Sequence, residues 1–577
     1  MKTMRNINKY MTLTVLGGLL AFTSCETTEL DITLDPNALT PDQAGVDFFL
    51  NSIQEDFVRQ YEGDADFDLN DNFQSGGNTT GDGFNELGME MTRVVNMNGR
   101  NYQSVYQDSD MNDEWINAYR GVLADIRAMT PLAEAAEQTR HIGIAQFIEA
   151  YLMISMVDFF GDVPYSEIIQ GAEQNFNPAL DSGASIYDAM LLLLDDAIAN
   201  FNSSPSSDPA NDFFYGNDYD KWVNAANTLK LKIYLQRRLV DTNAEASFNA
   251  IIASGNYITD TADDFLYSWP AASATQPDTR HPRYGLNYQA AGAGEYMSNW
   301  LMQLMDTTDD PRIRYYFYRQ TSAVPGAGIA PNEELLNCSL ETPPQHYLDA
   351  GFGGDFCFLP NGFWGRAHGE ADGIPPDGLL RATYGTYPVG GRFDDDSFQA
   401  INPSSGGGGT GITNLLTAFG VDFMRAEMAL AAGNTGGART FMMAGISKSI
   451  AKVQAFLSGR VAGADTSFEP SEAAIDLYMN TTVGIRFDDA DIDGKWDVLA
   501  EQFFIAHFGN GVEPYNFYRR TGFPTTLQPN LEPDPGTFIR SMYYPANAVN
   551  TNSNITQKTD QTQPVFWDTN PSAPVAN

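Results

Sequence analysis

The chain has 577 residues, of which 43% are hydrophobic and 12% aromatic. Such a composition can build large cores and excludes a disordered protein. The length suits two or three ordinary domains or one large helical body with insertions. With 33 basic against 74 acidic residues, the formal net charge is −41. A charge this negative repels phosphate backbones, which argues against nucleic acid as a partner.

The N-terminus has the pattern of a lipoprotein signal peptide. Three basic residues and no acidic residue precede the apolar run Met11–Phe22. This run is shorter than the ~20 apolar residues that a membrane-spanning helix needs. A serine and Cys25 follow, in an order that resembles a lipobox with Cys25 as the lipidated residue. The alternative is an ordinary secretory signal with a chance cysteine. We predict a signal peptide at 1–24 and a lipidated tether at 25–41.

The stretch Tyr151–Ile168 predicts a buried helix with an abrupt end. Apolar residues lie on nearly every side of the helix predicted at His141–Phe160, which is typical of a helix buried all round. Gly161 tolerates the left-handed turn that follows a helix. Pro164 keeps the residue before it extended. The chain therefore leaves this central helix through a Gly-Asp-Val-Pro exit.

Periodic apolar positions predict helical hairpins on both sides of a long loop-rich region. One stripe runs from Ile186 to Phe201, and another lies on Asp220–Val240, about one tetratricopeptide period later. Gly, Pro, Asn and aromatic residues dominate 260–413, where only Tyr296–Met305 has a helical pattern, and Gly63–Gly99 is predicted to be a loop as well. The other predicted helices are Asn112–Ala128, Val421–Ala431, Ala438–Leu457, Trp496–Ala506 and a first one opening within Asp35–Ala44.

The fold class that follows is mainly α, with a tetratricopeptide-like hairpin scaffold that carries a loop-rich, aromatic, ligand-presenting region. Loops this long in a compact protein are usually functional. In the polar tail, Phe566 and Trp567 are candidate anchors. The predicted parts are an N-terminal scaffold at 42–259, the loop-rich region at 260–413, a C-terminal scaffold at 414–546 and the tail at 547–577.

Separated stretches of the chain resemble the SusD/RagB family of nutrient-binding outer-membrane lipoproteins. The last of them, EQFFIAHFGNGVEPYNFYRRTGFP, is the most specific, because it is similar to the C-terminal signature of that family. The sequence DPNALTPDQA resembles the start of the mature domain in one SusD-like subfamily. The stretches are Asp35–Ala44, Tyr151–Glu167, Asp306–Tyr318, Gly362–Arg366, Phe423–Asn434 and Glu501–Pro524.

The resemblance implies a partner and a role. The partner is a TonB-dependent outer-membrane barrel of the SusC type, over which the lipoprotein sits as a lid. The role is to capture oligosaccharides or peptides at the cell surface and deliver them for import. The acidic residues Glu26, Glu29 and Asp31 resemble a surface-export signal, although they also share the acidity of the whole chain. This implies a lipid-anchored protein of the outer membrane that faces the exterior.

Carbohydrate recognition needs flat apolar faces with hydrogen-bonding groups at the rim. Trp364 is the foremost candidate, since Gly362 and Gly365 leave it little neighbouring bulk. The alternative is that each aromatic residue packs a small core of its own region, above all Trp300, which lies in a helical pattern. The candidate ligand-binding residues are Trp364, Phe363, Arg366, Trp300, Trp269, Tyr296, His368 and Asp372, with Asp377 as a polar contact and Asn72, Phe73 and Gln74 as a second cluster.

Charged motifs offer further candidates. Glu513, Arg519 and Arg520 belong to the family signature, and we expect them to form ion pairs with the scaffold rather than ligand contacts. The acidic runs Glu86–Glu90 and Asp394–Asp396 are expected to be solvated.

A calcium ion and a disulfide are also considered. Asp489, Asp491 and Asp493 begin a calcium-loop pattern that lacks the glutamate at its twelfth position, so they are a weak calcium candidate. Cys338 and Cys357 can pair outside the cytoplasm, but the sequence does not place them within reach.

Signals for catalysis are thin. The chain has five histidines and contains no H-E-x-x-H, G-x-S-x-G or P-loop motif. Paired carboxylates serve glycoside hydrolases, but none here stands in a recognisable setting. We therefore predict a binding protein without catalysis or cofactor. The alternatives are a surface glycoside hydrolase or peptidase, and a structural or adhesive surface protein.

Overall fold

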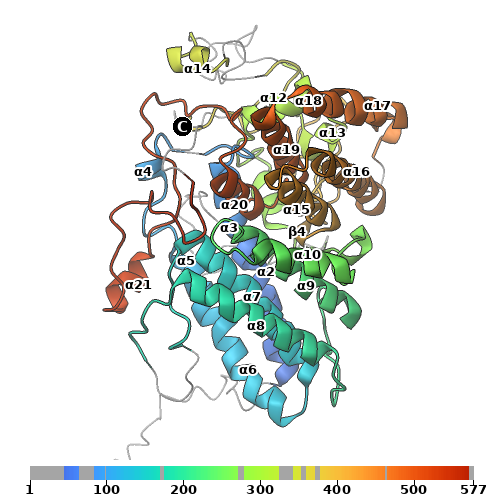
Figure 1. Cartoon of the computed structure of the whole chain (residues 1–577). Coiled ribbons are helices and arrows are strands. Elements are labelled where there is room, and N and C mark those ends of the chain that lie inside the picture. The colour runs from blue at the N-terminus through green and yellow to red at the C-terminus, as the bar shows by residue number, and fades with distance from the viewer. Residues whose placement is uncertain are drawn as a thin grey trace, which may run out of the picture. The chain divides into compact units, whose positions relative to one another are not determined.

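The apolar stretch Thr139–Phe160 forms the central helix α7 of this computed structural model (Figure 1). Its apolar side chains are buried on every side, as predicted for a helix without a polar face. Within the described part of the chain, α7 is the one helix long and apolar enough to cross a membrane, and 89% of that window is buried. This packing identifies it as a core helix. The structure describes residues 45–63, 83–97, 99–168, 175–270, 278–323, 342–352, 359–370, 377–461 and 464–570.

The exit from α7 is fixed to the helix that follows. Gly161 has a φ of +79°, which costs glycine little. Asp162 accepts a hydrogen bond from the backbone amide of Gly183 at 2.8 Å. Val163 pairs with Asp181 in an antiparallel bridge. The Gly-Asp-Val-Pro exit is therefore a scaffold element.

Helical hairpins follow α7, as the apolar periodicity predicts. The N-terminal scaffold contains α2 (Val46–Glu62), α6 (Leu123–Ala135), α8 (Gly183–Phe201), α9 (Tyr219–Gln236) and α10 (Ala244–Ser254). Helix α8 packs along α7, α9 packs along α8, and α2 lies against α6 and α7. Ser182 and Asp218 cap α8 and α9, because their side chains accept hydrogen bonds from backbone amides of the first turn.

The helix predicted at Asn112–Ala128 contains a π-helical segment. Helix α5 (Asn112–Ile116) continues through η1 (Asn117–Val122) into α6. Such π segments are rare and occur frequently at functional sites. Asn117 donates a hydrogen bond to the side-chain oxygen of Gln60 on α2, at 2.9 Å. This contact holds the π segment against the scaffold.

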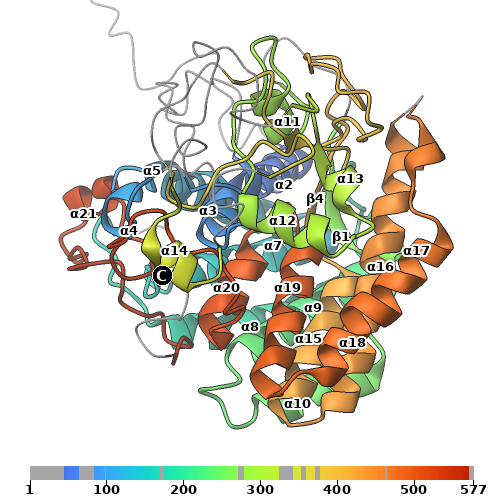
Figure 2. The same cartoon turned by 90° about the horizontal axis from the view of Figure 1, so that it is seen from above.

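The C-terminal scaffold repeats the hairpin pattern. Its elements are α15 (Ala418–Ala431), α16 (Thr435–Arg460), η4 (Thr466–Phe468), α17 (Glu472–Leu477), η5 (Tyr478–Val483), α18 (Gly484–Asp489), α19 (Ile492–Ala506) and α20 (Val512–Thr521). Helices α15, α16 and α19 confirm the periodic stripes, and Figure 2 shows α16 beside the α17–α18 run. Helices α17, α18 and α20 were not predicted, since α17 and α18 are six residues each and α20 is mostly polar.

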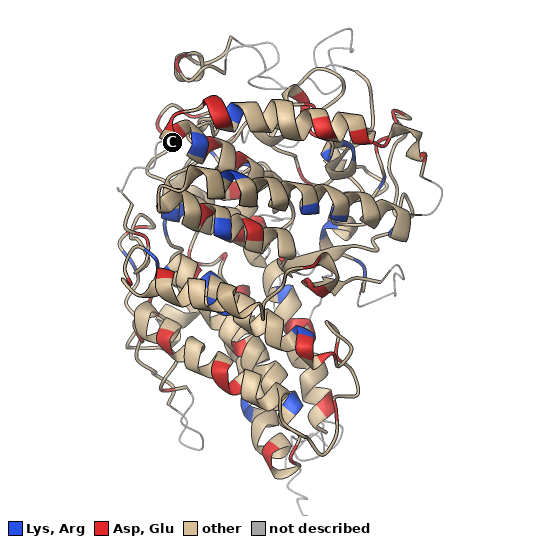
Figure 3. Ribbon diagram, turned by 45° about the vertical axis from the view of Figure 1, so that its right-hand side comes forward, with Lys and Arg blue, Asp and Glu red and all other residues tan. Residues whose placement is uncertain are grey.

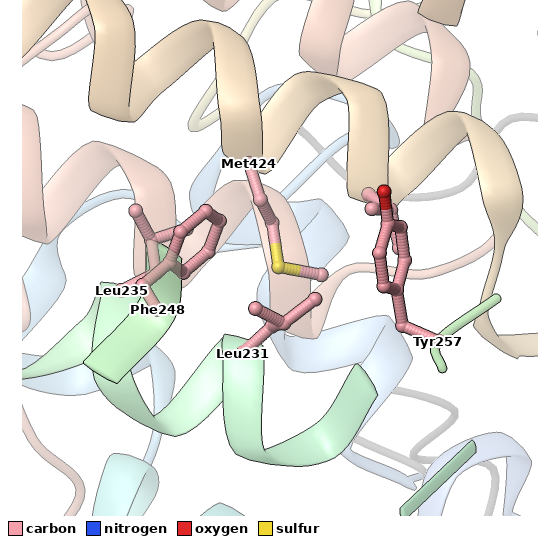
Figure 4. Packing of buried hydrophobic residues seen from close by; sticks show 6 residues of the cluster. Leu231, Leu235, Phe248, Tyr257 and Met424 are labelled. Carbon is pink, nitrogen blue, oxygen red and sulfur yellow. The ribbon is translucent and has the colours of Figure 1, made fainter. Parts of the chain in front are cut away.

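Apolar side chains join the two scaffold halves. Met424 points from α15 toward Leu231 of α9 (Figure 4). Leu235, Phe248 and Tyr257 belong to the same buried cluster. The two halves therefore share one core, in which N-terminal and C-terminal hairpins pack directly.

The loop-rich region begins and ends in one small sheet. Strand β1 (Phe265–Ser268) pairs antiparallel with β4 (Ile412–Leu416), and Figure 2 shows short helices gathered beside these strands. The prediction of a single helix in this region was wrong, because helices of one or two turns carry no apolar periodicity. The other elements are α11 (Pro282–Asn287), α12 (Asn299–Thr307), α13 (Ile313–Tyr316), α14 (Gln345–Asp349), the 3₁₀ turn η2 (Thr261–Asp263), and the strand pair β2 (Phe317–Tyr318) and β3 (Thr383–Tyr384).

Two acidic runs that were expected to be solvated are partly buried. Acidic residues are spread over both scaffold halves (Figure 3). However, Glu86 and Glu90 lie in the buried helix α3 (Gly83–Met91), within the predicted loop. Asp394 is also buried and pairs with Arg319 at 2.6 Å. Buried carboxylates keep such partners because an unpaired buried charge is costly.

The polar tail is anchored as predicted. Trp567 is fully buried, and the ring of Phe566 packs edge-on against Tyr187 of α8 at 4.9 Å. The tail therefore returns to the N-terminal scaffold. Two short helices complete the described elements, α4 (Tyr102–Val105) and α21 (Ala546–Thr551).

Candidate functional site

The aromatic residues predicted to present a ligand are buried. Each of the seven described candidates exposes at most 8% of its surface. A sugar ring stacks only on an open aromatic face. This burial favours the alternative, in which these side chains pack the interior of their own region, and ligand binding by one or two of them stays a prediction. The seven are Trp269, Tyr296, Trp300, Phe363, Trp364, Arg366 and His368.

The three tryptophans hold the loop-rich region together. The indole nitrogen of Trp364 donates to the carbonyl oxygen of Ala323 at 2.8 Å. That of Trp300 donates to the carbonyl of Thr526 at 2.7 Å. That of Trp269 donates to the hydroxyl of Thr413 at 2.9 Å. Buried indoles find such partners as a rule, and here the partners come from distant parts of the chain.

Tyr296 lies between two guanidinium groups. The Cζ atoms of Arg366 and Arg381 are 3.9 and 3.8 Å from its ring centroid. Its hydroxyl donates to Asp377 at 2.7 Å, and Asp377 pairs with Arg381 at 2.7 Å. Burial raises the pKa of Tyr296. Asp377, expected as a polar ligand contact, therefore completes an internal charge cluster.

Two further candidates also have internal partners. Phe363 packs under the Arg319 guanidinium at 4.9 Å. His368 is hydrogen-bonded to the Tyr102 hydroxyl at 3.0 Å. Burial lowers the pKa of His368 well below its ordinary range, and the charge of Arg93 lowers it further. The imidazole is therefore neutral at physiological pH.

Several sequence candidates lie outside the described residues. They are Cys25, Asn72, Phe73, Gln74, Cys338, Cys357 and Asp372, so the lipidation, the second cluster and the disulfide stay predictions.

Two of the three family-signature residues form the predicted ion pairs with the scaffold. Glu513 pairs with Lys232 of α9 at 2.5 Å. Arg520 pairs with Glu427 of α15 at 2.6 Å. Arg519 instead donates to the carbonyl oxygen of Asp158 at 2.7 Å. All these side chains are largely buried, so they join α20 to both scaffold halves and do not face solvent.

The weak calcium candidate coincides with a helix boundary. Asp489 ends α18, and Asp491 caps α19 by accepting a hydrogen bond from the amide of Gly494 at 2.9 Å. Among the described residues, no three His, Cys, Asp or Glu side chains come together as a metal site. N-terminal capping therefore accounts for Asp491, and calcium binding at these residues stays a prediction.

One open pocket involves the π segment η1. It has a volume of about 390 Å³, within the ~300–1,000 Å³ range of ligand pockets. Three separate parts of the chain line it: 115–127 of the helix that contains η1, the residues Pro164, Ile168 and Pro178 after α7, and 548–555 with α21. Helix α21 packs against α5, as Figure 1 shows. We call this the π-segment pocket.

Aromatic residues form one wall of the π-segment pocket. Trp115 and Tyr119, one turn apart, have ring centroids 4.8 Å apart. Trp115 packs edge-on against Phe160 of α7 at 5.3 Å. The Tyr119 hydroxyl donates to the carbonyl of Pro164 at 2.8 Å. Trp115 is thus the buried floor, and Tyr119 is the ring that keeps an exposed part.

A fixed guanidinium stands beside these rings. Arg127 donates to both carboxylate oxygens of Glu149, at 2.6 and 2.8 Å. The Tyr165 hydroxyl donates to the same carboxylate at 2.9 Å. The Arg127 side chain still exposes 29% of its surface. Sequence reasoning missed this pocket, although a Trp and a Tyr one turn apart in a predicted helix were a visible signal.

Known proteins resemble the chain in both sequence and structure. A family model described as "Starch-binding associating with outer membrane" matches residues 69–329. A model described as "Susd and RagB outer membrane lipoprotein" matches residues 404–563. No curated protein matches the chain.

Solved structures agree with these matches in fold. A chitin-binding SusD homolog from Flavobacterium johnsoniae is 19% identical with a TM-score of 0.56, over 84% of this chain and 93% of that one. A SusD homolog from Bacteroides fragilis is 15% identical with a TM-score of 0.61, over 91% and 100%. A SusD/RagB family protein from Bacteroides thetaiotaomicron is 18% identical with a TM-score of 0.58, over 92% and 100%.

Proposed function

This chain belongs to the SusD/RagB family, and from that premise we propose that it is a cell-surface binding lipoprotein. It captures oligosaccharides, or alternatively peptides, and delivers them to a TonB-dependent outer-membrane transporter of the SusC type. The observation that carries the proposal is the match of two models of one family, in order, along one helical scaffold.

Oligosaccharides are the favoured ligand class. One matched model describes starch binding, and one similar structure is described as chitin-binding. The acidic chain also favours neutral ligands, because a net charge of −41 repels anionic ones. Peptides stay the alternative, since pockets lined by aromatic and aliphatic side chains suit both classes.

The proposal includes no catalysis and no cofactor. The rival is a surface glycoside hydrolase or peptidase, and incubation with oligosaccharides and peptides separates the two. We expect the ligands to be recovered intact by mass spectrometry, and product formation would establish the rival.

Binding and partner are tested separately. A glycan array beside a peptide library, probed with the purified chain, should show selective retention of oligosaccharides. Affinity purification from membranes should recover a large TonB-dependent barrel. A structural or adhesive protein would give neither result.

A further inference from the structure

We propose that the π-segment pocket binds one neutral sugar ring of an oligosaccharide. This inference rests on the proposed function and adds a place and a ligand class to it. The pocket lies outside the loop-rich region, to which the sequence assigned the ligand. Three observations support the proposal: the fixed walls of the pocket, the apolar and polar side chains that line it, and the charge of the chain.

The pocket is built from elements that hold each other in place. The amide of Ala546, at the start of α21, donates to the carbonyl of Asp108 at 2.9 Å. The side chain of Asn552 donates to the carbonyl of Pro178 at 2.8 Å. On the opposite side, Asn117 ties the π segment to α2. A pocket fixed in this way loses little entropy when a ligand enters, which favours affinity.

One side of the pocket matches the apolar face of a pyranose. Tyr119 and Ile168, which are half-buried, supply aromatic and aliphatic surface, and Leu123, Pro164 and Ile555 line the pocket as buried side chains. The C–H face of a sugar ring packs on such surface, as apolar groups generally do. Trp115 beneath Tyr119 restrains its ring.

The other side matches the hydroxyl edge of the sugar. Arg127, Thr551 and Asn552 place a guanidinium, a hydroxyl and an amide around the pocket. Because Glu149 already fixes the Arg127 guanidinium, no side-chain entropy of Arg127 is lost when a ligand binds. The guanidinium carries five N–H donors, of which the bonds to Glu149 use two, and the side chain exposes 29% of its surface, so a sugar oxygen is a fitting acceptor. An apolar peptide side chain would form no hydrogen bonds with these polar groups.

Charge favours a neutral sugar over an anionic one. The guanidinium of Arg127 is already paired with a carboxylate, so it offers hydrogen bonds rather than a free positive charge. The remaining chain is strongly acidic. A uronate or sulfated glycan would meet a repulsive field that a neutral pyranose does not.

Two substitutions test the proposal, one that fills the pocket and one that removes the Tyr119 ring, and each has a matched control variant. Ala124 lines the pocket at an exposed helix position, so Ala124→Trp should occupy the space without disturbing the core, and Ala124→Ser is its control. Tyr119→Ala removes the ring, and Tyr119→Phe keeps it. Titration calorimetry of the mature chain uses maltohexaose, hexa-N-acetylchitohexaose and an uncharged hexapeptide as probes, and circular dichroism checks folding.

For a sugar that binds the native chain, we expect both Ala124→Trp and Tyr119→Ala to weaken binding at least about tenfold, or to remove one site per chain. A rise in Kd of about tenfold corresponds to a loss of about 1.4 kcal/mol in binding free energy. The Kd of the two control variants should stay within about twofold of the native value, which is below about 0.5 kcal/mol by the same conversion. If Ala124→Trp folds and binds the sugar like the native chain, the pocket is not the site, while the proposed function stands. If the hexapeptide alone binds and Ala124→Trp blocks it, the sugar assignment is overturned. If the native chain binds neither these probes nor any glycan of the array, both the pocket assignment and glycan capture fail.

Discussion

The indole nitrogen of Trp567 donates a hydrogen bond to Oδ1 of Asp158, at 2.9 Å. Asp158 lies near the end of the central helix α7, and Trp567 lies in the C-terminal tail. The same carboxylate accepts hydrogen bonds from the hydroxyl of Tyr187 and the amide of Asn516. One buried acid therefore joins α7, α8, α20 and the tail.

This arrangement makes the tail a stability element. Trp567→Ala removes a fully buried indole and one donor to Asp158. We expect the free energy of unfolding to fall by about 3–5 kcal/mol, as for large-to-small substitutions in cores. Denaturant unfolding measures it, and Thr569→Ala, an exposed position nearby, should change stability by less than about 0.5 kcal/mol. Equal stability of the two variants would contradict the anchoring role.

A second prediction concerns the charged contacts of α20. Glu427 is fully buried and accepts hydrogen bonds from Arg520 and Arg238. Burial by itself would raise the pKa of Glu427, yet the two guanidiniums lower it below its ordinary value. Glu427→Ala leaves both cations without this partner, so we expect a loss of about 3–5 kcal/mol in the free energy of unfolding.

The control for this variant is Glu134→Ala, at an exposed position of α6, where we expect a change within about 0.5 kcal/mol. Thermal and urea unfolding of the two variants compare them directly. Indistinguishable midpoints would show that the signature residues do not stabilise the scaffold.

The helices were predictable from the sequence where a full apolar period was present. α7, α8 and α9 each contain several turns with a stripe or an all-round apolar surface, so local spacing predicts them. The family-signature ion pairs were also foreseen, because buried charges need partners. Helix α20 was not, since its buried polar side chains break the apolar pattern.

The candidate site was harder to predict, because burial depends on contacts between distant segments. Trp300 lies 226 residues from its acceptor Thr526, and Trp269 lies 144 residues from Thr413. No local pattern distinguishes such a buried indole from an exposed one. The π-segment pocket also needs three segments, which come together only in the folded chain.

The predicted lipid anchor gives a direct test of localisation. Cys25→Ala removes the only thiol that the signal sequence could present for lipidation, so the protein should be released from the outer membrane into the soluble fraction. Stable attachment depends on the acyl chains, each buried CH₂ contributing about 0.8 kcal/mol. Fractionation and immunoblotting measure the distribution. Unchanged membrane retention would refute lipidation at this residue.

Glu114 makes stability depend on pH. It is buried, and one of its oxygens accepts a hydrogen bond from the amide of Gly83 at 3.0 Å. Burial raises its pKa from 4.5 to about 8. Between these values the folded state holds a proton that the unfolded state has lost, so stability falls as pH rises, by up to about 1.4 kcal/mol per pH unit.

Glu114→Gln should remove this slope while it keeps the acceptor for Gly83. Urea unfolding of both proteins at pH 5 and pH 8 measures the difference. We expect the free energy of unfolding of the variant, relative to that of the native protein, to be higher at pH 8 than at pH 5, because the glutamine side chain cannot ionise. Parallel pH profiles for the two proteins would mean that Glu114 is ionised in the folded state, in conflict with its burial against α3.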